Sequence, residues 1–189
     1  MKRIHPLLVL SILFTISSGG NCRKSSGPTD VLPPETHEGL NTMGCMVNGT
    51  LFIPQEPLLN PQGYYFARYS NLDLRLAWTD QPDCGITSVV IELDSIQLVE
   101  GTTYTLGVQP DTTNTRNLNA QWAGYYNIPC GATFEVYSTT GQVTGQVAID
   151  YYDSSRGIVS GNFSFDAVDK NSDTVHVREG RFDMSLQPQ

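Results

Sequence analysis

The stretch LDLRLAWT, residues 72–79, carries the clearest structural signal in the chain. Large apolar side chains alternate along it with smaller or polar ones, and the apolar set is Leu72, Leu74, Leu76 and Trp78. A period of two is typical of a β-strand with one buried face, whereas a helix repeats every 3.6 residues. The stretch therefore predicts a strand of an antiparallel sheet, with this apolar set on one face.

Similar runs lie on both sides of this stretch, separated by turn signals. Asn48-Gly49 predicts a hairpin between residues 45–47 and 50–53. A second hairpin is expected to join residues 157–168 and 174–186 around Lys170-Asn171-Ser172. In its last strand Val175, Val177, Phe182 and Met184 share a face only if Glu179-Gly180 forms a bulge. The remaining expected strands are residues 64–70, 86–98, 103–108, 120–126, 132–138 and 143–152.

No run of helical period competes with these strands. About ten short strands predict an all-β domain, a single antiparallel β-sandwich or barrel, and the pattern leaves both architectures open.

Residues 1–21 have the pattern of a lipoprotein signal peptide. Lys2 and Arg3 precede the apolar run 7–16, which is too short to span a bilayer, since that takes about 20 residues. Cys22 follows, at the position where bacterial lipoproteins carry lipid, and we expect its lipidation to tie the protein to a membrane. Gly19 and Asn21 depart from the usual lipoprotein pattern, so a secreted soluble protein cut after Gly20 is the alternative.

Residues 22–39 are rich in Ser, Pro, Gly and Thr and are expected to form a flexible tether, which leaves 40–189 as the all-β domain. The chain has 11 basic and 19 acidic residues and a net charge of −8. This balance argues against nucleic acid as a partner.

Four cysteines are present. With Cys22 lipidated, an oxidising compartment favours one disulfide among the other three. We expect it to join Cys84 and Cys130, which lie in loops of similar sequence, and we expect Cys45 to be a small core residue.

Motifs at both ends of the predicted domain support a family resemblance. Residues 38–49 contain Gly-Cys-Met-Val-Asn-Gly, and residues 158–165 and 174–183 close the domain, the latter ending in Gly-Arg-Phe-Asp. The chain resembles a family of uncharacterised lipoproteins from Bacteroidota, a domain of unknown function. The resemblance implies an exported β-domain and no particular activity. Arg23-Lys24 replaces the acidic residues typical of surface-displayed relatives. That departure favours an outer-membrane lipoprotein of the cell envelope that faces the periplasm.

The sequence contains few groups for catalysis. Of the three histidines, His5 lies in the signal, His37 in the tether and His176 in a strand, where it is expected to face solvent. Nucleophilic catalysis usually needs a base such as histidine, and no His/Cys cluster has zinc-ligand spacing, so no catalytic residue, cofactor or metal is expected. The carboxylate pairs Glu92/Asp94 and Asp150/Asp153 leave one alternative, a carboxylate-dependent hydrolase acting on envelope or dietary glycans.

Aromatic doublets are the candidate binding residues. Neighbours in a strand point to opposite faces, so each doublet is expected to bury one ring and expose the other. Exposed rings suit a glycan, a protein or a small ligand. The chain is therefore expected to be a non-catalytic binding or structural module rather than an enzyme. The candidates are Tyr64, Tyr65, Trp122, Tyr125, Tyr126, Tyr151 and Tyr152.

Overall fold

A computed structural model describes residues 31–55, 65–70, 72–81, 84–109 and 120–187. The expected signal peptide, the lipidation site Cys22 and the candidate Tyr64 lie outside these residues. Within them, no helix is long and apolar enough to cross a membrane.

The described residues form eleven strands, all paired antiparallel in one curled sheet, a half-barrel. The expected all-β class is confirmed, and the curled sheet lies between the sandwich and the barrel that the sequence left open. The strands are β1 (Thr42–Val47), β2 (Thr50–Phe52), β3 (Tyr65–Ser70), β4 (Asp73–Asp80), β5 (Ile86–Leu93), β6 (Thr102–Leu106), β7 (Gln121–Ile128), β8 (Glu135–Ser138), β9 (Gly145–Asp153), β10 (Ile158–Val168) and β11 (Thr174–Ser185).

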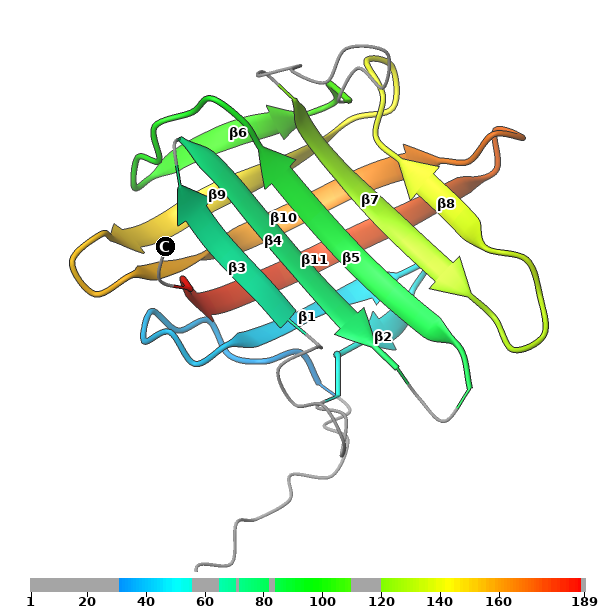
Figure 1. Ribbon diagram of the computed structural model, residues 1–189, viewed down its shortest axis with the longest axis horizontal. Helices are drawn as coiled ribbons and strands as arrows, with labels where there is room; N and C mark the ends of the chain where they lie inside the picture. Colours follow the sequence, from blue (N-terminus) through cyan, green and yellow to red (C-terminus); the bar gives the residue numbers. More distant parts are fainter. Residues whose placement is uncertain (1–30, 56–64, 71, 82–83, 110–119, 188–189) are drawn as a thin grey trace, which may run out of the picture.

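The sheet curls so that two layers face each other (Figure 1). The front layer has the order β3-β4-β5-β7-β8, and the back layer consists of β6-β9-β10-β11-β1-β2. Strand β10 joins them, because it pairs with β9 along most of its length and with β8 at Val168. The core lies between the layers, where Trp78 of β4 stacks on Phe163 of β10 with ring centroids 5.8 Å apart.

Both hairpins that the turn residues predict are present in the structure. Val47 pairs with Thr50 across Asn48-Gly49, and both turn residues have positive φ, as the tight hairpin turn requires. In the second hairpin Gly180 pairs with Phe163 and Val177 with Phe165, so Arg178 and Glu179 together face one residue of β10. The bulge is therefore confirmed, one residue earlier than expected. As predicted, it places the apolar side chains of β11 in the core: Val175, Val177, Phe182 and Met184 are all at most 4% exposed.

Leu72 departs from the expected pattern. Leu74, Leu76 and Trp78 are buried, but Leu72 precedes β4, has φ +67° and is 49% exposed. The prediction of a shared buried face is wrong for this residue, because a left-handed turn conformation rotates its side chain away from the strand pattern.

The three cysteines in the described residues are arranged as expected. Cys84 and Cys130 form a disulfide with their Cα atoms 5.4 Å apart, which links the β4–β5 and β7–β8 connections. Cys45 is fully buried in β1, and burial raises the pKa of its thiol to about 12. Cys45 is therefore a core residue.

Residues 31–39, which the sequence assigns to the tether, lie against the outer face of the back layer. Asp183 of β11, 1% exposed, accepts hydrogen bonds from Thr36 Oγ1 at 2.7 Å and from the backbone N–H groups of Glu38 at 3.0 Å and Gly39 at 2.7 Å. We call Thr36–Leu40 and the Asp183 carboxylate the Asp183 clamp. The folded domain therefore begins before residue 40. The sequence did not reveal this, because backbone groups rather than apolar side chains make the attachment.

Candidate functional site

The candidate aromatic residues do not gather in one site, because each doublet splits across a layer. Tyr125 packs against the core beside Tyr137, whereas Tyr126 stacks on Phe134 outside it. Tyr152 likewise packs against the core, and Tyr151 stacks on His37 with ring centroids 5.3 Å apart. The two rings of each doublet thus lie on opposite faces, but all four are half-buried, and neither doublet shows one buried and one exposed ring. Tyr65 also packs against the core.

The outer face of the front layer carries an aromatic group. The rings of Trp122 and Tyr126 lean over Gly124, where an added Cβ would lie 2.7 Å from Trp122 and 3.2 Å from Tyr126. Phe134, 53% exposed, extends this group, and the sequence analysis missed it because it is not part of an aromatic doublet. Trp122 is only 8% exposed, and its Nε1 has no hydrogen-bond partner among the described residues. The accessible rings are therefore those of Tyr126 and Phe134.

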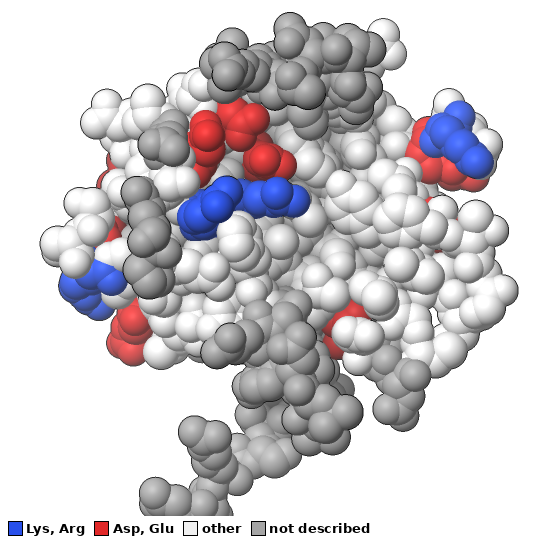
Figure 2. Space-filling model, in the orientation of Figure 1, with Lys and Arg blue, Asp and Glu red and all other residues white. Residues whose placement is uncertain are grey.

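One end of this face is charged. Figure 2 shows acidic and basic side chains side by side there, next to a largely uncharged surface. The register places Arg75 beside Glu92, and burial, with the charges of Glu92 and Asp73, raises the pKa of Asp94 to about 6. The expected pair Glu92/Asp94 is therefore electrostatically coupled. No group of three or more His, Cys, Asp or Glu side chains in the described residues could hold a metal ion.

The second expected carboxylate pair has two separate structural roles. Asp150 accepts a hydrogen bond from Asn162, whereas Asp153 Oδ1 accepts from Ser155 and from the backbone of Arg156. The Ser155 hydroxyl and the Arg156 N–H lower the pKa of Asp153. Asp153 thus stabilises the turn after β9.

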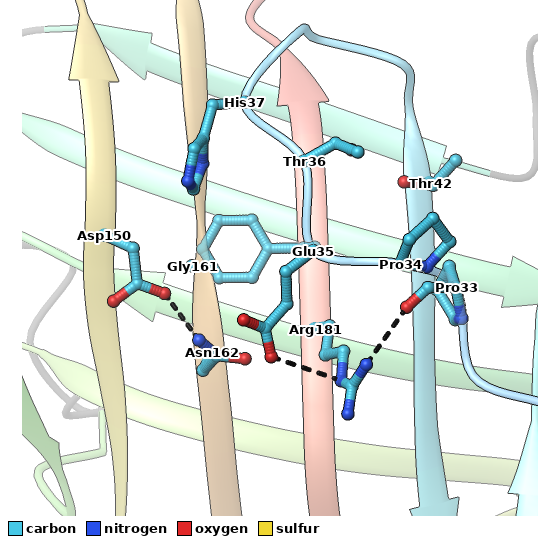
Figure 3. A pocket seen from close by; sticks show the side chains of 11 residues that line it. Pro33, Pro34, Glu35, Thr36, His37, Thr42, Asp150, Gly161, Asn162 and Arg181 are labelled. Atoms are coloured by element: carbon cyan, nitrogen blue, oxygen red, sulfur yellow. Dashed lines mark hydrogen bonds and ion pairs between the residues drawn. The ribbon is translucent and has the colours of Figure 1, made fainter.

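A small polar pocket lies under residues 33–37 (Figure 3). Arg181 of β11 reaches Glu35 at 3.6 Å and donates to the carbonyl of Pro33 at 3.4 Å. The pocket has a volume of about 10 Å³, enough for a single water. The Arg181 contacts hold the N-terminal segment against β11, and the pocket has no room for an organic ligand.

Both described histidines have hydrogen-bond partners. His37, expected in the tether, is instead brought to Ser160 by the Asp183 clamp, but Ser160 is fully buried, so a substrate cannot reach its hydroxyl. His176 is exposed, as expected, and bonds Asp166, which also binds Arg178. Within the described residues neither histidine activates an accessible nucleophile.

A cleft lies between the end of β3, the turn from β9 to β10 and the residues after β11. The end of β3 and the β9–β10 turn lie at the left in Figure 1. This cleft, which we call the end cleft, has a volume of about 620 Å³. The front layer contributes residues 69–72, apart from 71, which is not described. The back layer contributes Tyr152 and residues 154–157, and the end of β11 continues into Leu186 and Gln187 at the edge.

Two tyrosines form an edge-to-face pair in the end cleft, with ring centroids 5.7 Å apart and an interplanar angle of 86°. The Tyr69 hydroxyl donates to the Ile96 carbonyl at 3.0 Å and accepts from the Leu98 N–H at 3.3 Å, which fixes its ring. The Tyr152 hydroxyl has no hydrogen-bond partner among the described residues, and burial, with Tyr69 beside it, raises its pKa. Of the candidate aromatic residues that the structure describes, Tyr152 alone lines this cleft.

Comparison with curated proteins and with solved structures finds no match for this chain. A family model described as a domain of unknown function (DUF6252) matches residues 85–184, from the start of β5 almost to the end of β11. The closing motifs, 158–165 and 174–183, lie inside the match and the opening motif, 38–49, lies outside it. The expected membership of an uncharacterised domain family is confirmed, while the Bacteroidota origin and the lipid anchor stay predictions. Because the match spans more than half of the chain, the protein belongs to the DUF6252 family.

Proposed function

We propose that the protein is an exported, lipid-anchored component of the cell envelope that acts as a non-catalytic binding module through its end cleft. The observation that carries the proposal is the cleft itself. Its volume of about 620 Å³ lies within the roughly 300–1,000 Å³ of small-molecule sites. Two tyrosine rings and two leucine side chains line it, together with three serines, one arginine and one glutamine.

Export is supported by the N-terminal pattern and by the disulfide between Cys84 and Cys130, since disulfides persist in oxidising compartments. Lipid on Cys22 would place the protein at a membrane, and Arg23-Lys24 favours the periplasmic side of the outer membrane. Mass spectrometry of the mature N-terminus tests this, with Cys22→Ala as the control. A diacylglyceryl mass on Cys22 is expected, whereas an unmodified N-terminus at Asn21 would show a secreted soluble protein.

The absence of catalysis is supported by the environments of His37 and His176. The first contacts a buried serine and the second a carboxylate, so neither is arranged as a base beside an accessible hydroxyl or thiol.

Binding in the end cleft is tested with N-phenyl-1-naphthylamine, an uncharged probe whose fluorescence rises in apolar surroundings. One probe per protein is expected, with affinity lowered several-fold in Leu72→Asn. Asparagine tolerates positive φ, so this variant removes apolar surface without straining the turn. Val99→Asn, at an equally exposed valine outside the cleft, is the matched control. Equal effects of the two variants, or failure of both this probe and its anionic analogue 1-anilinonaphthalene-8-sulfonate to bind, would contradict the proposed site.

A second function, a carboxylate-dependent hydrolase acting on envelope or dietary glycans, is favoured by one observation. Asp94, with a pKa of about 6, lies near Glu92, and this pKa suits a general acid. Reducing-sugar release from glycans, measured against pH, tests it. Activity that falls above about pH 6 and disappears in both Asp94→Asn and Glu92→Gln would establish this function, and no release by the wild-type protein would exclude it for the glycans tested.

A further inference from the structure

We propose that the end cleft selects amphipathic anions, molecules that join an acyl or aromatic group to a single carboxylate. The inference rests on the proposed function, that the end cleft binds small molecules, and adds the chemical class of the ligand.

The described lining of the cleft differs in charge from the chain as a whole. The whole protein has 19 acidic and 11 basic residues. The described lining of the cleft nevertheless contains one basic residue, Arg156, and no acidic one. The guanidinium of Arg156, half exposed and 3.9 Å from Asp153, therefore favours a single negative charge on a ligand in the cleft, against the repulsion of the remaining surface.

The Arg156 guanidinium has N–H groups that no described residue uses and that could bind such a ligand. Among the described residues its guanidinium makes one contact, from Nε to Asp153 at 3.9 Å, and its side chain is 53% exposed. The other oxygen of Asp153 already accepts from Ser155 Oγ at 2.7 Å and from the N–H groups of Ser155 at 2.9 Å and Arg156 at 3.0 Å. These bonds fix the backbone on which Arg156 lies. A ligand carboxylate could then take two parallel hydrogen bonds from the guanidinium.

The Tyr152 hydroxyl is a second donor in the same cleft. It has no partner among the described residues, and its raised pKa keeps it protonated at neutral pH. An anion in the cleft would accept from this hydroxyl, whereas an uncharged hydrocarbon would leave it without a partner.

The rest of the lining suits an apolar group. Leu72, half exposed with φ +67°, and Leu186 lie at the cleft with the ring of Tyr69. A leucine in this conformation costs free energy that glycine or asparagine would not cost. Contact with a ligand's hydrocarbon would bury the exposed part of Leu72 and offset that cost. The apolar end of the ligand would thus contact apolar side chains, and its carboxylate would bind the guanidinium.

The experiment compares two probes that share their aromatic rings. 1-Anilinonaphthalene-8-sulfonate carries one negative charge, and N-phenyl-1-naphthylamine carries none. Wild-type protein is expected to bind the sulfonate at one site, at least tenfold more tightly than the uncharged probe. Decanoate is expected to displace it, and decanol is not.

Arg156→Gln is the decisive variant. It is expected to weaken sulfonate binding at least tenfold and to leave the uncharged probe unaffected. Lys170→Gln removes one positive charge from the exposed turn between β10 and β11, away from the cleft, and is expected to change neither. Equal binding of both probes by the wild-type protein, or equal effects of the two variants, would overturn anion selection while the cleft stands as a small-molecule site. Failure of both probes to bind would overturn the proposed function as well.

Discussion

Asp183→Asn should destabilise the protein and release its N-terminal segment. The carboxylate is almost fully buried, and its Oδ2 atom accepts from Thr36 Oγ1 and the Glu38 N–H, while Oδ1 accepts from the Gly39 N–H. Asparagine keeps one oxygen, which can serve the first two donors. Its amide nitrogen then faces the Gly39 N–H, and two donors oppose each other.

The size of the effect follows from these contacts. A hydrogen bond to a charged group contributes about 1.5–3 kcal/mol and a neutral one about 0.5–1.5 kcal/mol. One charged bond is lost and two others become neutral, so we expect a loss of about 3.5–6 kcal/mol. For a domain of this size that lowers Tm by roughly 7–24 °C.

Urea denaturation and hydrogen exchange measure the two consequences separately. The Asp183→Asn protein is expected to unfold at lower urea, and the amides of Glu38 and Gly39 are expected to lose protection. Asp150→Asn, at an exposed carboxylate on β9 of the same layer, is the matched control and should cost less than about 1 kcal/mol. If both variants had the same stability and the same exchange pattern, the clamp would contribute nothing and the reasoning would be refuted.

The same contacts predict a pH dependence. Burial alone would raise the pKa of Asp183, but the hydrogen bonds from Thr36, Glu38 and Gly39 outweigh it and lower the pKa. The ionised form is therefore the one stabilised by folding. Its contribution is fully present well above the unfolded value of about 3.9 and is lost as pH falls through the lower folded pKa. The stability difference between wild type and Asp183→Asn should be constant from about pH 6 to 8 and shrink below about pH 4.

Two further variants test the core and the disulfide. Gly180→Ala should cost about 1–3 kcal/mol in urea denaturation, because its Cβ would lie 2.5 Å from the ring of Phe163, whereas Gly141→Ala, with nothing within 4 Å, should be nearly neutral. Replacing Cys84 and Cys130 by serine should cost about 4 kcal/mol for a sequence separation of 46, and reduction of the wild-type protein should lower its stability equally. A reduced wild type as stable as the oxidised protein would contradict the second expectation.

The all-β fold could be predicted because its signals are local. The alternation over 74–78 and the turn at Asn48-Gly49 each involve neighbouring residues, and the structure repeats them without change. The bulge in β11 was also predictable, since only an extra residue brings Val177 and Phe182 to the same face. Leu72 was not, because an unbroken alternation does not show where the chain turns.

The end cleft and the Asp183 clamp could not be predicted, because both join distant segments. The cleft combines Tyr69, Ser70 and Leu72 with Tyr152, residues 154–157 and residues 186–187, and none of these segments has an unusual composition. The clamp joins Asp183 to a segment more than 140 residues earlier in the chain. Periodicity indicates which face of a strand a side chain lies on, but it does not indicate which distant segments contact each other in the fold. For the same reason the doublet rule put Tyr151 and Tyr152 on opposite faces but could not place Tyr152 in a cleft.

The end cleft is expected to be formed before a ligand arrives, because backbone hydrogen bonds tie together the segments around it. After β11 the Leu186 N–H donates to the Gly157 carbonyl of the back layer at 2.7 Å, and the Gln187 N–H donates to the Ala67 carbonyl of the front layer at 2.8 Å. Consecutive residues thus bond both layers at the cleft. A ligand that contacts Tyr69 and Arg156 would span the same two layers and add to this connection. It would therefore stabilise the folded protein by mass action, and the layers would not have to separate to admit it.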